Sequence, residues 1–128
     1  MTISYQHDLD GVSERQLGRF FVSWPNPPAP ATHLRLLRGS QHVVGFITAL
    51  SDGVLSAYIP HLEVLPAYQG RGIGTVLLQQ MLGQLRELYM VDLICDPPLQ
   101  PFYERLGMRP WSGMVLRNYD RQSGESPE

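Results

Sequence analysis

The sequence contains no lysine: all ten of its basic residues are arginines, set against twelve acidic residues. The formal net charge of −2 does not favour broad electrostatic attraction to nucleic acid or to an anionic membrane. Any bound anion must therefore be held at a local site. The absence of lysine also excludes Schiff-base chemistry on the chain's own side chains, and it excludes the Walker A motif, which ends in Gly-Lys-Ser/Thr.

Cysteine and long apolar runs are also scarce. Cys95 is the single cysteine, which excludes an intrachain disulfide and any multi-cysteine metal site, and its apolar neighbours predict a small buried thiol. The histidines show no metal-ligand spacing, so no metal is expected. No apolar stretch approaches the roughly 18 residues that span a bilayer, and the N-terminus shows no signal-peptide pattern. A cytoplasmic protein is therefore expected.

The length of 128 residues suits one domain, predicted over residues 1–120, with a polar tail over 121–128. Strands and helices alternate in the pattern, which predicts an α/β chain with a mixed sheet. Strands are expected over 3–6, 33–38, 42–53, 54–66 and 90–96, with one or two more over 108–119. Helices are expected over 13–24, 73–88 and 98–107, and the proline-rich segment 25–31 is expected to be a loop. Pro60 interrupts its predicted strand, so it is expected at a bulge or where strand pairing ends.

Three glycines, Gly70, Gly72 and Gly74, stand at the start of the predicted helix over 73–88. Glycine costs roughly 0.5–1 kcal/mol relative to alanine inside a helix, so this placement needs a compensating reason. A helix N-terminus offers unpaired backbone N–H groups and partial positive charge, which bind phosphate when no side chain blocks the backbone. A tight strand-to-helix turn without a ligand is the alternative. A dinucleotide fingerprint fits poorly, because Thr75 replaces its last glycine and the chain has too few βαβ units, although Asp92 lies at the right spacing.

The residues around the glycines carry a more specific signal. The segment from Val64 and Pro66 through Gln69-Gly-Arg-Gly-Ile-Gly74 resembles motif A of the GCN5-related N-acetyltransferases (GNAT). About 30 residues later "PFYERLGM" resembles motif B of that family, with Met108 in place of the usual phenylalanine. The resemblance covers residues 33–118 in element order. It implies the GNAT fold, a central twisted mixed sheet flanked by helices, with splayed strands at the cofactor site.

The resemblance implies that acetyl-coenzyme A is the cofactor. Its pyrophosphate is expected on the glycine loop, and its pantetheine arm is expected to pair with the backbone of the preceding strand. Asp96 stands where the family commonly has asparagine, a change shared with plant and cyanobacterial serotonin-type N-acetyltransferases. The cofactor-binding residues implied in this way are Leu62, Val64, Gln69, Gly70, Arg71, Gly72, Ile73, Gly74, Thr75, Asp96, Phe102 and Tyr103.

Two tyrosines are the implied catalytic residues. Tyr103 matches the tyrosine near the coenzyme sulfur in many family members, where a phenol can protonate the leaving thiolate; packing against pantetheine is the alternative. The carboxylate that many relatives carry on the motif A strand is absent, because Pro60 and Tyr58 stand at those positions. Tyr58 is therefore expected to hold a water. His61 and Glu63 have the opposite strand parity from Tyr58 and Leu62, unless a bulge reverses it.

The expected partner is a small-molecule primary amine, with an aromatic or apolar amine favoured by Phe20, Phe21, Trp24 and Trp111. No nucleic acid or membrane partner is expected, and a homodimer is left open. Three alternatives remain: a non-catalytic acyl-coenzyme A-binding module on the same fold, an acetyltransferase of protein N-termini or lysine side chains, and a nicotinamide dinucleotide binder. Fold alone does not select among acceptors.

Overall fold

The computed structural model of this chain describes Tyr5 and residues 43–124. Contacts divide the chain into two compact units, residues 45–115 and residues 1–44 together with 116–128. The first unit holds the sheet and the two α-helices, whereas the short 3₁₀-helix η3 (Tyr119–Arg121) belongs to the second. The expected helix over 13–24, the loop over 25–31, the strand over 33–38 and, except for Tyr5, the strand over 3–6 lie outside the described residues.

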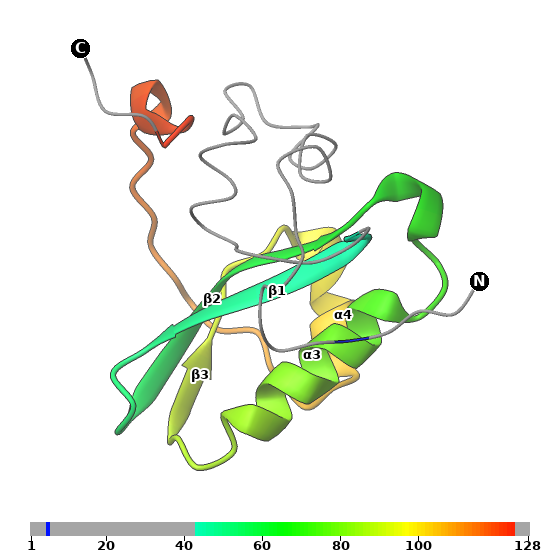
Figure 1. Cartoon of the computed structure of the whole chain (residues 1–128). Coiled ribbons are helices and arrows are strands. Elements are labelled where there is room, and N and C mark those ends of the chain that lie inside the picture. The colour runs from blue at the N-terminus through cyan, green and yellow to red at the C-terminus, as the bar shows by residue number, and fades with distance from the viewer. Residues whose placement is uncertain (1–4, 6–42, 125–128) are drawn as a thin grey trace. The chain divides into compact units, whose positions relative to one another are not determined.

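Within the described residues, three strands form a sheet in the order β1-β2-β3 (Figure 1). β1 (Gly45–Ser51) pairs antiparallel with β2 (Ser56–Val64), and β2 pairs parallel with β3 (Met90–Asp92). The sheet is therefore mixed and carries helices, which confirms the predicted fold class.

A tight turn joins β1 to β2, as the "SDG" sequence predicts. The Asp52 carboxylate accepts hydrogen bonds from the backbone N–H groups of Val54, Leu55 and Ser56 at 2.8, 2.8 and 3.1 Å. These bonds favour the charged carboxylate and hold the Asp52 pKa far below its usual range. Gly53 adopts φ 74°, a conformation that suits glycine.

Pro60 lies in a β-bulge. Thr48 pairs with His61, and Leu50 pairs with Tyr58. Two residues of β2, Ile59 and Pro60, therefore oppose a single residue of β1, Ala49. A bulged residue makes no regular ladder bond, so the missing N–H of proline costs no pairing here. The expected position of Pro60 is confirmed.

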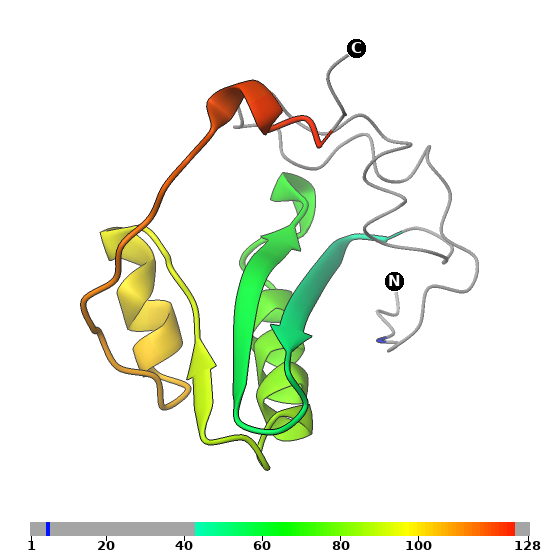
Figure 2. The ribbon, with the colours of Figure 1, turned by 90° about the vertical axis from the view of Figure 1, so that its left-hand side faces the viewer.

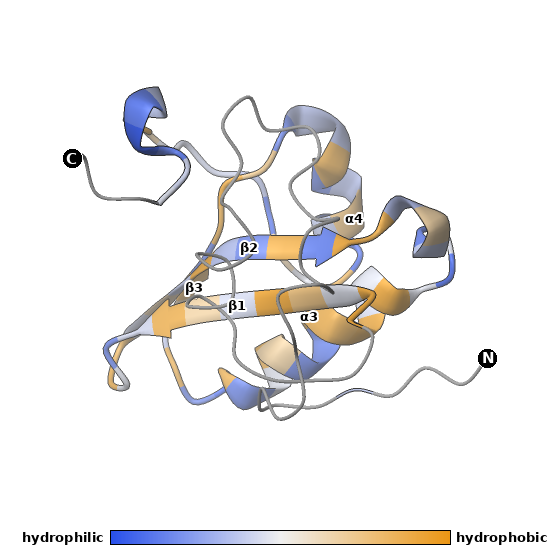
Figure 3. Ribbon diagram, turned by 45° about the horizontal axis from the view of Figure 1, so that its top comes forward, coloured by the Kyte–Doolittle hydropathy of each residue, from blue (hydrophilic) through white to orange (hydrophobic). Residues whose placement is uncertain are grey.

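Helix α3 (Ile73–Gln84) packs against β1 and β2 and supplies the centre of the core (Figures 1 and 3). It is one turn shorter than expected, because the chain leaves the helix at Leu85. Leu78 is completely buried and Ile73 is 3% exposed. The apolar positions that spacing favours, such as Val76 and Leu77, are only partly buried. Leu77 nevertheless faces β1, because a Cβ atom at Gly45 would lie 3.4 Å from its side chain.

Replacing Leu78 by alanine is expected to lower the free energy of unfolding by about 2–5 kcal/mol, because the side chain fills a site that solvent does not reach. Denaturant unfolding measures this as a lower midpoint at an unchanged slope. Leu55→Ala is the matched control, since Leu55 is 53% exposed in the β1–β2 turn and should cost less than about 1 kcal/mol. Equal losses in the two variants would show that α3 is not the centre of the core.

The C-terminal part of the first unit differs from expectation in two places. The strand predicted over 90–96 is only three residues long, and Ile94 is 47% exposed, so it is not a fully buried strand. The second difference is that residues 108–118 form no strand in the structure. A strand needs a partner edge, and the short β3 offers little. The helix expected over 98–107 is shorter: the two prolines lie in the 3₁₀-helix η2 (Pro97–Leu99), helix α4 (Gln100–Glu104) follows, and Gly107 has φ 96°.

Candidate functional site

Strands β2 and β3 are paired only at one end. Their register runs from Ser56 opposite Met90 to Tyr58 opposite Asp92, and there it stops. Beyond this point the chain leaves β3 toward η2 and α4, away from β2 (Figure 2). Within the described part of the chain, β2 is therefore paired with β1 alone from Ile59 to Val64, over a length of roughly 20 Å at about 3.3 Å per residue.

This edge of β2 carries backbone groups that can bind an extended ligand. In an antiparallel ladder, every second residue directs its N–H and C=O away from its partner strand. The Val64 carbonyl accepts a hydrogen bond from the Gln69 side-chain amide at 3.0 Å, which indicates that Val64, and with it Leu62, belongs to that outward-facing set. The Gln69 side chain thus turns back onto β2, while the glycine loop continues past it.

The glycine loop opens at the end of β2, and its first two glycines have left-handed backbones. Gly70 has φ 77° and Gly72 φ 80°, and a Cβ atom at either position would meet no atom within 4 Å. Gly72 is the N-cap of α3, without a side-chain cap, and the first helical hydrogen bond is donated by Val76 to the Gly72 carbonyl. The N–H groups of residues 73–75 precede that bond, so they lie at the helix end where an anion can bind.

The third glycine has a different surrounding. A Cβ atom at Gly74 would lie 3.6 Å from the Phe102 ring and 3.8 Å from the Val64 side chain, which are ordinary contact distances. Gly74 therefore faces β2 and α4, and an alanine would fit at this position. Beside the loop, the Arg71 guanidinium stacks over the Tyr68 ring at 5.2 Å. This places a positive charge at the loop, as its sequence suggests.

Helix α4 carries Phe102 and Tyr103 side by side. Their rings meet edge to face, with centroids 5.0 Å apart, and Phe102 also packs toward the start of α3. Burial raises the pKa of the Tyr103 phenol, and the neighbouring Cys95 raises it further. The phenol is therefore protonated at neutral pH and can act as a proton donor.

Cys95 lies beside Tyr103 but is only half-buried, which corrects the expectation of a buried thiol. The residue lies beyond Asp92, the last residue of β3 that pairs with β2, so no strand pairing continues at this position among the described residues. Burial raises the pKa of its thiol, and the adjacent Asp96 carboxylate adds to the effect. Asp96 itself precedes η2 as its N-cap, and its side chain makes no capping bond.

The bulge at Pro60 changes which side chains share a face of the sheet. Phe46, Thr48 and Leu50 alternate along β1 on one face, and their partners on β2 are Glu63, His61 and Tyr58. Directly opposed residues share a face, so Tyr58, His61 and Glu63 lie on the same one. Val64 lies on the opposite face, toward α3, because a Cβ atom at Gly45 would lie close to the side chains of both Val64 and Leu77. The bulge therefore reverses the parity, the alternative that the sequence left open: His61 shares a face with Tyr58, and Leu62 lies on the other face.

Burial shifts the pKa values of two ionisable side chains on this face, His61 and Glu63. His61 exchanges a hydrogen bond with the Thr48 hydroxyl at 3.2 Å, and burial lowers its pKa. Its imidazole is therefore neutral at neutral pH and can accept a proton. Burial raises the pKa of Glu63. The sequence could have revealed this arrangement only through Pro60, the one local sign of a bulge.

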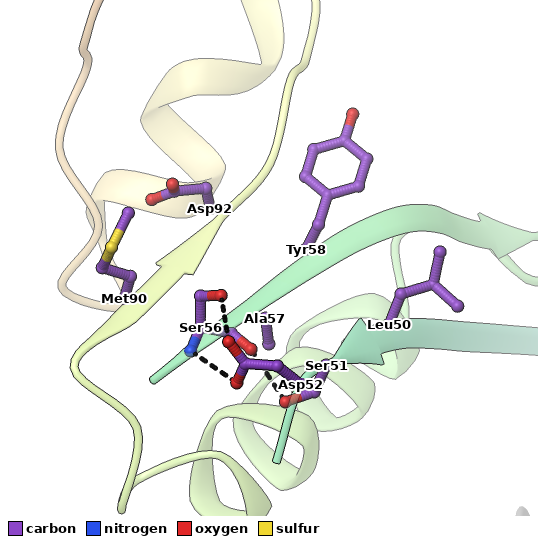
Figure 4. Close-up of a pocket in the computed structure, with 8 residues that line it drawn as sticks. All are labelled: Leu50, Ser51, Asp52, Ser56, Ala57, Tyr58, Met90 and Asp92. Atoms are coloured by element: carbon purple, nitrogen blue, oxygen red, sulfur yellow. Dashed lines mark hydrogen bonds between the residues drawn. The ribbon is translucent and has the colours of Figure 1, made fainter. Parts of the chain in front are cut away.

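An open depression of about 430 Å³ lies where β2 and β3 meet (Figure 4). Tyr58, Leu50 and Asp92 stand on the face turned away from α3, whereas Ala57 points to the other side. In the sequence, Asp92 has a role only in the dinucleotide alternative, as the acid that would bind a ribose. In the structure, the sheet register places Asp92 directly opposite Tyr58. The lining residues are Leu50, Ser51, Asp52, Ser56, Ala57, Tyr58, Met90 and Asp92.

The described residues contain neither a metal-binding cluster nor a membrane-spanning helix. Within Tyr5 and 43–124, no group of three or more His, Cys, Asp or Glu side chains is arranged to hold a metal ion. Among the helices of the same residues, none is long and apolar enough to cross a membrane.

The chain matches the sequence profile of the acetyltransferase (GNAT) family over residues 5–108. Its fold matches the crystal structure of a candidate acetyltransferase from Deinococcus radiodurans R1, with a TM-score of 0.88 and 45% identity over 95% of this chain and 92% of that one. A GNAT-family acetyltransferase from Streptococcus pneumoniae TIGR4 matches at a TM-score of 0.65 and 26% identity, over 84% of this chain and 92% of that one.

Curated relatives are more distant and longer. An uncharacterised N-acetyltransferase, ycf52, of Pyropia yezoensis is 29% identical over 102 residues, which are 78% of this chain and 59% of that protein. A histone acetyltransferase of Glycine max is 32% identical over 122 residues, 79% of this chain and 50% of its own length. The chain thus spans only about half of these two relatives.

Proposed function

Because this chain belongs to the acetyltransferase (GNAT) family, we propose that it transfers the acetyl group of acetyl-coenzyme A to a primary amine of a small molecule. The observation that carries the proposal is the continuity of two binding features. Beyond its last pair with β3, the β2 edge that faces away from β1 runs from Ile59 to Val64 and leads directly into the glycine loop at the start of α3. A ligand with an extended, amide-containing arm that ends in a pyrophosphate needs a strand edge for the arm, followed by a loop that binds the pyrophosphate.

The residues present fit such a cofactor. Gly70 and Gly72 leave the space in front of the loop open, and the N–H groups of residues 73–75 can bind phosphate oxygens. Arg71 adds charge beside the loop, and outward-facing groups of Leu62 and Val64 can pair with the arm. When bound, acetyl-coenzyme A supplies a thioester, an acyl group activated toward attack by an amine.

Tyr103 is proposed as the acid. The amine nitrogen forms a bond to the acetyl carbon, the carbon–sulfur bond breaks, and the departing thiolate takes a proton. The Tyr103 phenol is protonated at neutral pH because burial raises its pKa. It can therefore donate that proton or stabilise the negative charge on sulfur.

The amine must lose a proton in the same reaction. Tyr58 lies where the paired part of β2 ends and is proposed to hold a water that takes this proton. His61 lies on the same face, three residues further along β2, and is neutral at neutral pH because burial lowers its pKa. It is the group to which such a water can pass the proton.

The test of the cofactor assignment is thermal stability with added ligand. Coenzyme A at 100 times its dissociation constant is expected to stabilise the folded protein by about 2.7 kcal/mol, seen as a raised melting temperature. NADH at the same concentration serves as the control for the dinucleotide alternative and should produce no shift. An unchanged melting temperature in millimolar coenzyme A contradicts the proposed cofactor.

A non-catalytic acyl-coenzyme A-binding module is the second candidate. Tyr58 and Pro60 favour it, since both positions lack the carboxylate that many relatives carry on this strand. Release of free thiol from acetyl-coenzyme A in the presence of a panel of amines distinguishes the two. Thiol release with N-acetylated product, detected as a mass increase of the amine, supports the enzyme. Binding without release supports the module.

A further inference from the structure

We propose that the depression between β2 and β3 binds the acceptor amine in its protonated form, with Asp92 as the specificity-determining residue. This inference rests on the proposed acetyl transfer and names the chemical class of its acceptor. That class is a primary ammonium on an apolar stem with no carboxylate beside the nitrogen. Two sources supply it: a free alkyl or arylalkyl amine, and the lysine side chain of a protein.

The position of the depression follows from the direction of the cofactor site. The glycine loop lies at the Val64 end of the β2 edge over Ile59–Val64, and the other end of that edge closes at the Tyr58–Asp92 pair. A cofactor held by its pyrophosphate at the loop therefore extends its reactive end toward this closed end. The depression lies there, so its occupant is next to the acyl group.

The lining of the depression combines apolar walls with one available charge. Leu50, Tyr58 and Met90 are 69%, 39% and 39% exposed and form an apolar surface that includes an aromatic ring (Figure 4). Asp92 stands directly across from Tyr58, and none of the hydrogen bonds or ion pairs found in the described residues involves its carboxylate. A phenol ring and a carboxylate on one wall are a suitable pair for an ammonium group.

Asp52, the second acidic residue of the depression, does not compete with Asp92 for the ammonium group. The Asp52 carboxylate is already bound by three backbone N–H groups and by the Ser56 hydroxyl, so it stabilises the turn. Among the lining residues of this described region there is no arginine or histidine. An ammonium is therefore attracted to Asp92 without a competing positive charge, whereas a ligand carboxylate next to the amine is repelled.

The first test compares two amines that differ by one carboxylate. The native chain is expected to acetylate 2-phenylethylamine in preference to phenylalanine, as measured by kcat/KM. Asp92→Asn should reduce this preference about tenfold or more, through a higher KM for 2-phenylethylamine. Asp92→Glu should restore part of it. Glu87→Gln is the charge-matched control, because Glu87 is an exposed acid outside the depression and should leave the preference unchanged.

A binding measurement keeps the inference independent of turnover. In ¹⁵N-labelled protein, 2-phenylethylamine should shift amide signals of Leu50, Tyr58 and Asp92, and neutral 2-phenylethanol should shift them much less. Nα-acetyl-lysine amide is the second probe, and tighter binding of one probe than of the other identifies the source. Asp92→Asn should weaken both.

The outcomes separate this inference from the proposed function. Equal preference in Asp92→Asn and Glu87→Gln, or equal binding of 2-phenylethylamine and 2-phenylethanol, overturns the inference even if acetyl transfer occurs. Charge-dependent amine binding at these residues supports the inference even if coenzyme A fails to bind, and in that case the proposed transfer is what fails.

Discussion

Replacing Gly72 by valine is expected to weaken coenzyme A binding at least a hundredfold, equivalent to about 3 kcal/mol. Gly72 caps α3 with φ 80°, and the space in front of it is open, so a branched side chain occupies the place where a pyrophosphate approaches the backbone. Isothermal titration with coenzyme A measures the effect directly.

Backbone strain must be separated from lost binding in that variant, because valine at positive φ is itself destabilising. Gly53→Val is the matched control: Gly53 has φ 74°, is also surrounded by open space, and lies in the β1–β2 turn away from the loop. Both variants should lose similar stability, but only Gly72→Val should lose binding. Gly74→Ala is a second control and should bind normally, because its Cβ points toward Phe102 at 3.6 Å. Normal binding by Gly72→Val would falsify the phosphate site.

Replacing Tyr103 by phenylalanine is expected to lower kcat by at least about tenfold, because general acid–base assistance typically supplies about 10²–10⁴-fold. Phenylalanine keeps the edge-to-face contact with Phe102 and the packing of α4, and it removes only the hydroxyl. The affinity for coenzyme A should therefore barely change. Steady-state kinetics and calorimetry on the same preparation measure the two quantities.

Tyr89→Phe is the control for this change, since Tyr89 is 83% exposed between α3 and β3 and outside the site. A parallel loss of rate and affinity in Tyr103→Phe would favour the packing role of Tyr103. An unchanged rate would mean that solvent protonates the thiolate. A smaller loss is expected for Tyr58→Phe, whose hydroxyl is proposed to act through a water.

Local sequence was sufficient for the features whose causes are local. The glycine loop could be predicted because left-handed backbone at a helix start requires glycine, and the structure has it at Gly70 and Gly72. The turn at Asp52, the start of α4 after two prolines and the bulge at Pro60 follow from equally local chemistry. The family resemblance also rested on contiguous residues, and the comparisons confirmed it.

The features that depend on distant partners could not be predicted in this way. The strand expected over 108–119 finds no partner edge among the described residues, and the strand expected over 90–96 is shortened because β3 pairs with β2 over only three residues. Strand propensity describes a side chain's fit to a sheet, whereas a ladder needs a second strand at the right place.

The features of the candidate site also fall into those with local causes and those that depend on distant partners. The sequence by itself determined the glycine loop and the tyrosine of α4, since each belongs to a motif of residues adjacent in the chain. Its composition by itself determined the lack of any lysine or second cysteine. Only the tertiary structure decided that Tyr58, His61 and Glu63 share a face, and that Asp92 stands across from Tyr58. One extra residue in a strand turns every later side chain to the other face, and the pairing that fixes this lies in another strand.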